Sequence, residues 1–186
     1  MTATELDRKF DAVMAAVTGP GGRVIIERDE LGRAIVGNFP ATLPLFFKTF
    51  CALNASIEAV ICGTERLTYA DLDLLSDQLA RGLVKRGVRK GDRVAIAMRN
   101  CTGWVLAYMG AIKAGAIATL INGWWQVEEL AHALQLSEPA LILADDPRAH
   151  RIAATRGEWT VETIDIERPA AEAFQHLLET DDRYRA

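Results

Sequence analysis

The sequence predicts an α/β protein with a partial doubly wound, mostly parallel sheet and helices on both faces of that sheet. Apolar runs at 94–98, 116–121 and 140–144 lack the alternation of half-buried strands, so each is expected to be buried on both sides. Helical patterns separate these runs along the chain. Strands that alternate with helices form right-handed βαβ units, and such units build a parallel sheet. We expect the three apolar strands to be central in it.

The first 65 residues are expected to form helices and short strands that pack on this core. A helix is predicted at 4–17, where apolar residues recur at helical spacing, and the glycine-rich segment 19–22 ends it. A strand is predicted at 24–27, followed by a hairpin turn at 31–33.

A second helix is predicted to begin after Thr42, with Pro44 in its first turn. Its inward face is expected to carry Leu45, Phe46, Phe50 and Leu53. Residues 57–63 are predicted to form a strand that pairs with 65–67 across a turn at Gly63 and Thr64.

The best-defined helix is predicted between Thr68 and Gly87. Thr68 and Asp71 have the spacing of a capping box, in which each side chain binds the backbone N–H of the other residue. Gly87 is a natural end for the helix. Its apolar stripe consists of Leu72, Leu75, Leu79 and Leu83.

The remaining elements are predicted to alternate in type. Strands are expected at 93–98, 116–121, 140–144 and 159–166, and helices at 102–114, at 126–136, from Arg148 onward, and at 170–178. We divide the chain into an N-terminal segment 1–65, a βαβ-type segment 66–180, and a tail or linker 181–186.

Composition excludes several classes of function. The chain has 186 residues, of which 50% are apolar, and a net charge of −4, so no basic surface for nucleic acid is expected. Cys51, Cys62 and Cys101 are widely spaced, which excludes a metal-binding motif and fits free thiols in the cytoplasm. The N-terminus lacks the apolar run of a signal peptide, and the longest apolar stretch is too interrupted for a membrane span.

The common catalytic motifs are not found in the sequence. There is no GxxxxGK[ST] loop, no GxGxxG after a predicted strand, no GxSxG and no HExxH. Neighbouring carboxylates such as Asp145 with Asp146 are interpreted as helix caps and solvated groups. We therefore predict no catalytic residue and no metal ligand in this chain.

Short phrases between 66 and 145 occur in a recognisable order. Residues 67–72 read LTYADL, 87–95 read GVRKGDRVA, 113–116 read KAGA, and 120–122 read LIN before the EEL of 128–130. In order and spacing this block resembles the N-terminal region of the adenylate-forming (AMP-binding) acyl-CoA synthetase and ligase family. The matching phrases are caps, turns and strands, so they indicate the scaffold and not the substrate.

The resemblance implies the N-terminal part of the large domain of an acid–thiol ligase of fatty acid metabolism. Such an enzyme uses ATP, Mg²⁺ and CoA to convert a carboxylic acid, here a fatty acid, into acyl-CoA, AMP and pyrophosphate. The family's phosphate-binding loop and catalytic lysine lie in later segments. We therefore expect no tight cofactor binding and no catalysis by this chain alone, and we expect the remainder of the ligase domain as its partner.

One local site follows from the same resemblance. The turn Asn122-Gly123-Trp124-Trp125 follows a predicted strand, and in some members a glycine here and arginines after the next strand approach the nucleotide end of CoA. The corresponding residues are Gly123, Arg148 and Arg151. The alternative is that both tryptophans pack against the remainder of the enzyme and the arginines are solvated. For the whole chain, the alternative to a ligase segment is a free-standing α/β binding module without catalysis.

Overall fold

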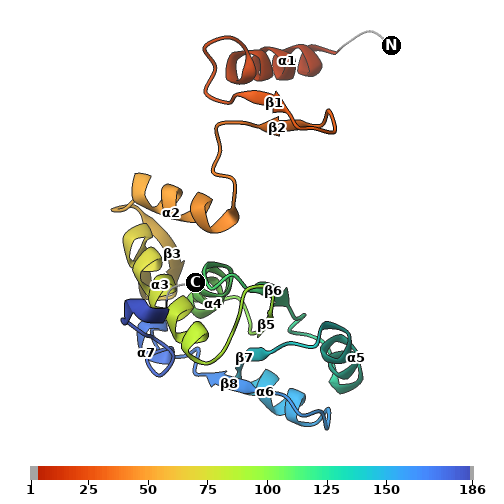
Figure 1. Ribbon diagram of the computed structural model, residues 1–186, viewed down its shortest axis with the longest axis vertical. Helices are drawn as coiled ribbons and strands as arrows, with labels where there is room; N and C mark the ends of the chain where they lie inside the picture. Colours follow the sequence, from red (N-terminus) through yellow and green to blue (C-terminus); the bar gives the residue numbers. More distant parts are fainter. Residues whose placement is uncertain (1–3, 185–186) are drawn as a thin grey trace. The chain divides into compact units, whose positions relative to one another are not determined.

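The computed structural model describes residues 4–184, and their contacts divide the chain into two compact units, Met1–Thr42 and Leu43–Ala186. The first unit contains helix α1 (Glu5–Thr18) and an antiparallel pair of strands, β1 (Ile26–Arg28) and β2 (Ala34–Val36) (Figure 1). The helix and the hairpin were both predicted from the sequence. No residue of α1 is buried, and the apolar side chains of Leu6 and Phe10 are exposed.

The second unit begins with helix α2 (Leu43–Leu53), the antiparallel strands β3 (Glu58–Cys62) and β4 (Glu65–Thr68), and the long helix α3 (Tyr69–Lys85). The predicted inward face of α2 is wrong for Leu45 and Leu53, whereas the Phe50 ring packs edge-on against Tyr69 of α3. Cys51 is its buried residue and Phe47, one turn earlier, packs in the same cluster, whereas Leu45 and Leu53 are exposed. This cluster includes Leu72 of α3, which fixes the face that α2 turns inward.

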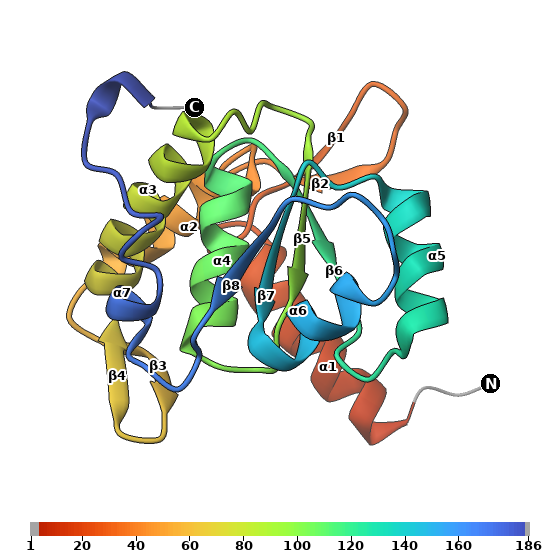
Figure 2. The ribbon, with the colours of Figure 1, turned by 90° about the horizontal axis from the view of Figure 1, so that it is seen from below.

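A four-stranded parallel sheet forms the centre of the second unit, with the order β6-β5-β7-β8. Its strands and the helices between them are β5 (Arg93–Ala97), α4 (Thr102–Lys113), β6 (Ile117–Leu120), α5 (Val127–Ser137), β7 (Leu141–Asp145), α6 (Asp146–Ala153) and β8 (Val161–Ile164). Figure 2 shows the strands side by side with the helices around them. The predicted α/β class and parallel sheet are confirmed.

The two faces of the sheet bury different side chains, because neighbouring residues of a strand point to opposite faces. Val94 and Ile96 of β5 belong to a core cluster with residues of α3 and α4. Ala95 and Ala97 belong to another cluster, with Leu130 of α5 and Ile152 of α6. Every residue of β7 is buried. Helices therefore cover both faces, as predicted.

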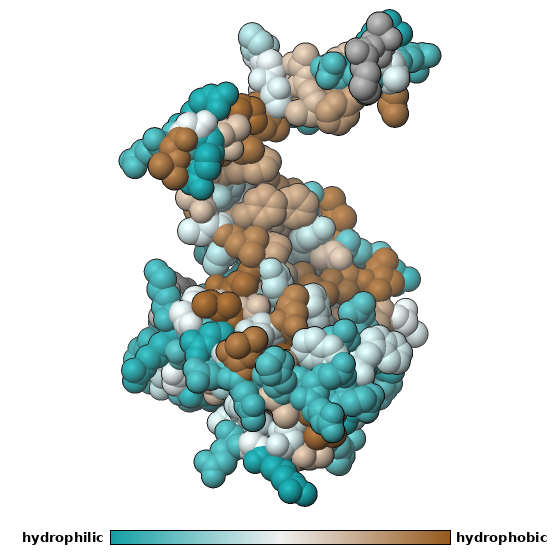
Figure 3. All heavy atoms as spheres, turned by 90° about the vertical axis from the view of Figure 1, so that its right-hand side faces the viewer, coloured by the Kyte–Doolittle hydropathy of each residue, from teal (hydrophilic) through white to brown (hydrophobic). Residues whose placement is uncertain are grey.

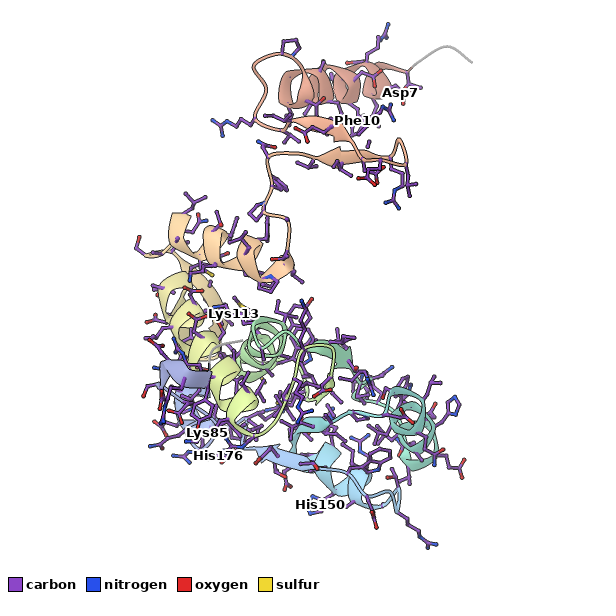
Figure 4. The ribbon with its side chains drawn as sticks, viewed as in Figure 1. Asp7, Phe10, Lys85, Lys113, His150 and His176 are labelled. Carbon is purple, nitrogen blue, oxygen red and sulfur yellow. The ribbon has the colours of Figure 1, made fainter. Side chains whose placement is uncertain are left out.

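Polar contacts fix α3 at its start and against α4. The predicted capping box is present, since the Thr68 hydroxyl accepts from the backbone N–H of Asp71 and the Asp71 carboxylate accepts from the backbone N–H of Thr68. Lys113 of α4 is almost buried and donates to Asp73 (2.6 Å) and Asp77 (2.8 Å) of α3 (Figure 4). These two ion pairs join the helices across their interface.

Two further sequence predictions, both about single elements, need correction. The apolar strand at 116–121 is not central: β6 lies at the edge of the sheet, and Ile117 and Leu120 are exposed. The predicted helix at 170–178 is shorter, because α7 (Ala170–Ala173) is followed by turns that bury Phe174 and Leu177 in the core. The chain then reaches the 3₁₀ turn η1 (Asp182–Tyr184).

The predicted boundary between residues 65 and 66 stays a prediction. Among residues 4–184, no helix has the length and apolar character needed to cross a bilayer.

Candidate ligand site at the carboxyl edge of the sheet

The carboxyl edge of the sheet contains a point where the direction of winding reverses. From β5 the chain crosses to β6 on one side, and then returns past β5 to β7 on the other side. The loops that leave β5 and β7 therefore diverge from each other. In open α/β sheets, ligands bind in the crevice that this divergence creates.

The loop after β6 is shaped by a local hydrogen bond. The side-chain oxygen of Asn122 accepts from the backbone N–H of Trp124 at 3.0 Å, which closes a tight turn around Gly123. The two tryptophans separate here. Trp124 is 85% exposed, whereas Trp125 packs against the core cluster under α5 and α6.

The structure brings Gly123, Arg148 and Arg151 together. Arg151 donates from Nη1 to the carbonyl oxygens of Gly123 (3.2 Å) and Trp125 (2.9 Å). A Cβ placed on Gly123 would lie 3.0 Å from Nη2 and 3.2 Å from Nε of Arg148. Glycine therefore lets the loop approach this guanidinium closely. Both arginines are partly buried and make hydrogen bonds within the chain.

Asp145, the last residue of β7, binds Arg148 and the loop after β5. It is fully buried, and its carboxylate accepts from the backbone N–H of Arg99 (3.0 Å), the backbone N–H of Arg148 (3.1 Å) and Nη1 of Arg148 (3.0 Å). The predicted capping role of Asp145 is confirmed, since it is the N-cap of α6. Its predicted solvation is wrong, and only the neighbouring Asp146 is exposed.

The loops after β5 and β6 and the start of α6 line an open hollow of about 630 Å³ at the carboxyl edge of the sheet. Its wall includes Asn100 after β5, Trp104 of α4, the turn Asn122–Trp125, and Arg148. Arg148 Nε is buried without a hydrogen-bond partner within the described part of the chain. The hollow thus combines aromatic surface with a guanidinium, a combination suited to an anionic aromatic ligand.

Cys62 and Cys101 line a separate hollow of about 360 Å³, between the β3–β4 turn and the start of α4. Burial raises the pKa of the Cys101 thiol, and the raising effect exceeds the lowering by nearby backbone N–H groups. Cys101 is therefore protonated at neutral pH and is not an activated nucleophile.

The family resemblance singled out Gly123, Arg148 and Arg151, which lie close together in the structure, and it did not point to Asp145. A signal was present: an acidic residue ends a fully apolar strand, and an arginine follows it three residues later. At that spacing, a helix cap and its first turn face each other, so the carboxylate can bind both the backbone and the side chain of the arginine.

The fold is that of a doubly wound α/β protein, and the carboxyl edge of its sheet carries an arginine-containing candidate ligand site. The sequence profile of the AMP-binding enzyme family matches residues 47–185. The chain therefore belongs to the AMP-binding enzyme family.

Individual relatives agree with this assignment. The chain is 35% identical over 147 residues to the medium/long-chain-fatty-acid–CoA ligase FadD6 of Mycobacterium tuberculosis, covering 77% of this chain and 25% of that protein. It is 39% identical over 95 residues to a medium/long-chain-fatty-acid–CoA/3-oxocholest-4-en-26-oate–CoA ligase of Mycobacterium marinum, covering 51% of this chain and 17% of the relative. The chain thus spans a quarter or less of these two curated relatives.

A solved structure of a long-chain-fatty-acid CoA ligase from Rhodopseudomonas palustris, described as putative, has the same fold. It superimposes with a TM-score of 0.66 at 25% identity, over 78% of this chain and 37% of the other. The predicted assignment to the N-terminal region of the family is confirmed.

Proposed function

We propose that this chain supplies the N-terminal part of an ATP-dependent acyl-CoA ligase acting on a fatty acid. The whole enzyme converts the acid, ATP and CoA into acyl-CoA, AMP and pyrophosphate. The observation that carries the proposal is the family match over 47–185, together with relatives whose names specify fatty-acid–CoA ligases. These relatives are much longer than this chain, which is why we assign catalysis to the complete ligase domain.

The hollow at the carboxyl edge is proposed to bind the nucleotide end of CoA. CoA supplies the thiol that accepts the acyl group, while its nucleotide end carries phosphates and an adenine ring. Arg148 would bind a phosphate, because its guanidinium lines the hollow and a hydrogen bond from a cation to a phosphate is charge-assisted. Gly123 admits the ligand closely, and Arg151 holds the loop through two backbone carbonyls.

ATP and Mg²⁺ are assigned to the remainder of the ligase domain, which is the proposed partner of this chain. Among residues 4–184, no group of three or more His, Cys, Asp or Glu side chains is arranged to hold a metal ion. We propose that neither ATP nor CoA binds tightly to the isolated chain. The proposed location is the cytoplasm, where Cys51, Cys62 and Cys101 would remain free thiols.

Reading the gene downstream of the Ala186 codon tests the proposal. We expect an open reading frame that continues into a phosphate-binding loop rich in Gly, Ser and Thr within a few dozen codons. A stop codon at that point, with the 186-residue protein detectable in cells, would contradict the proposal. The free-standing α/β binding module would then be the better interpretation.

A further inference from the structure

We infer that Asp145 is a positioning residue for the proposed site: it holds the Arg148 guanidinium in place at the wall of the hollow. The inference rests on the proposed function, in which Arg148 meets a phosphate of the CoA nucleotide. It assigns a binding role to a carboxylate that cannot touch the ligand, since Asp145 is fully buried.

Asp145 binds three donors through its two carboxylate oxygens. One carboxylate oxygen accepts from the backbone N–H of Arg148, and the other accepts from Arg148 Nη1 and from the backbone N–H of Arg99. The same side chain therefore fixes the start of α6, the loop after β5 and one corner of the guanidinium. With Nη1 held, the plane of the guanidinium cannot turn freely about the side chain.

A steric limit acts on the opposite side of the guanidinium. Gly123 lies against the Nε–Nη2 edge, close enough that an added Cβ would be 3.0 Å from Nη2. Arg148 Nε is buried and has no hydrogen-bond partner among residues 4–184, whereas Nη1 is paired. Asp145 and Gly123 thus confine the guanidinium between them, with Nη1 paired on one side and Gly123 packed on the other.

The charge of Asp145 allows the inference to be contradicted. Asp145 partly neutralises Arg148, so a purely electrostatic view predicts tighter phosphate binding once the carboxylate is removed. A positioning role predicts weaker binding. In Asp145→Asn, an amide NH₂ takes the place of one carboxylate oxygen and faces donors that it cannot accept from. At least one of the three hydrogen bonds is lost, and we expect the guanidinium to be held less firmly.

The first experiment measures the accessibility of Arg148 without any ligand. Wild-type chain, Asp145→Asn and the control Asp146→Asn are treated with phenylglyoxal, which modifies accessible arginines, and Arg148 is followed by mass spectrometry. Asp146 is the adjacent, exposed carboxylate, so it controls for the loss of one charge at this helix start. We expect Arg148 to react several-fold faster only in Asp145→Asn. Equal rates in all three proteins would overturn the inference.

The second experiment measures the binding of adenosine 3′,5′-bisphosphate, the nucleotide end of CoA, by NMR titration. We expect Asp145→Asn to weaken binding about tenfold, as for the loss of one charge-assisted hydrogen bond. In an Arg148→Met background, the same change should have no further effect. Tighter binding in Asp145→Asn, or equal weakening in both backgrounds, would overturn the inference.

The two experiments separate the inference from the proposed function. If the wild-type chain shows no shift with the nucleotide, the proposed CoA site fails, while the phenylglyoxal rates still decide whether Asp145 holds Arg148. If Asp145→Asn does not fold, Asp145→Glu replaces it in both experiments. This variant keeps the charge but moves the carboxylate by one methylene, so it should still expose Arg148 and weaken binding.

Discussion

Lys113 and Asp145 are charged side chains that the fold buries, and in both cases the partners make burial possible. Lys113 is 6% exposed and binds two carboxylates and one carbonyl of α3. Asp145 is fully buried and accepts three hydrogen bonds. A buried charge is tolerated when it is paired and hydrogen-bonded, so these residues fix the geometry around them.

Asp71 should give the second unit a measurable dependence on acid. Hydrogen bonds from the Thr68 side chain, and then from the Thr68 backbone, lower the pKa of the Asp71 carboxyl below its ordinary value. Because the folded pKa is lowered, the capping contribution is fully present above the unfolded pKa of about 3.9 and disappears as the pH falls through the folded pKa.

We therefore expect Asp71→Asn to lower the free energy of unfolding by up to about 1 kcal/mol at neutral pH. This difference should shrink towards zero as the pH is lowered below 4, and denaturant unfolding at a series of pH values would measure it. Glu158→Gln, which changes an exposed carboxylate in a loop, is the control. A difference that is independent of pH would contradict the expected role of the carboxylate.

The candidate site could be predicted from sequence only in part. Gly123 lies about 25 residues before the two arginines, and no periodicity of the sequence connects them. Only the family resemblance placed them in one site. Asp145 was interpreted as a solvated cap, because its capping position can be read locally but its burial cannot. Burial depends on the loop after β5, which the fold brings to Asp145 through the backbone N–H of Arg99.

Elements whose signals are local were predicted well. The start of α3 was predicted from its capping box and its inward face from its leucine stripe. The strands β5 and β7 were predicted from their unbroken apolar runs. Elements whose environment depends on distant parts of the chain were predicted less well. The apolar composition of β6 did not reveal that it is an edge strand, and the length of α7 was limited by the burial of Phe174.

Central and edge strands should differ sharply in their tolerance of charge. Val94 in β5 is fully buried, whereas Ile117 in the edge strand β6 is 55% exposed. Val94→Asp should abolish cooperative unfolding, because an unpaired carboxylate buried in apolar surroundings costs more than the stability of a typical domain allows. Ile117→Asp should change the free energy of unfolding by only about 0.5 kcal/mol.

Thermal unfolding followed by circular dichroism distinguishes these two variants. Ile142→Asp, in the other central strand, should behave like Val94→Asp, since Ile142 is also fully buried. A soluble Val94→Asp protein with the wild-type melting curve would mean that the strand assignment is wrong.

The second unit carries apolar side chains on its surface as well as in its core. Trp124, Ile117, Leu120 and Leu136 are all exposed. Figure 3 shows apolar side chains among polar ones on the side of this unit where β6 and α5 lie. Exposed apolar surface of this kind often marks a contact with another polypeptide. The remainder of a ligase domain, the partner proposed above, would provide such a contact.

The isolated chain should therefore bind a hydrophobic dye and associate as its concentration is raised. Trp124→Ser should reduce both dye fluorescence and association without lowering the melting temperature, since its ring is exposed. Trp125→Ser is the matched comparison and should lower the melting temperature, because Trp125 packs against the core. A wild-type chain that remains monomeric and ignores the dye would contradict this expectation.

The central claim is that this chain is the N-terminal part of a fatty-acid–CoA ligase and depends on the remainder of the domain for chemistry. A chimera tests both halves of the claim. The present chain would replace the corresponding N-terminal quarter of FadD6, with which it shares 35% identity over 147 residues.

Pyrophosphate release with ATP, Mg²⁺, CoA and a panel of fatty acids is the most direct measurement. We predict that the chimera releases pyrophosphate and forms acyl-CoA, and that the isolated chain does not exceed a control without protein. Turnover by the isolated chain, clearly above that control and abolished when the fatty acid is omitted, would contradict the account.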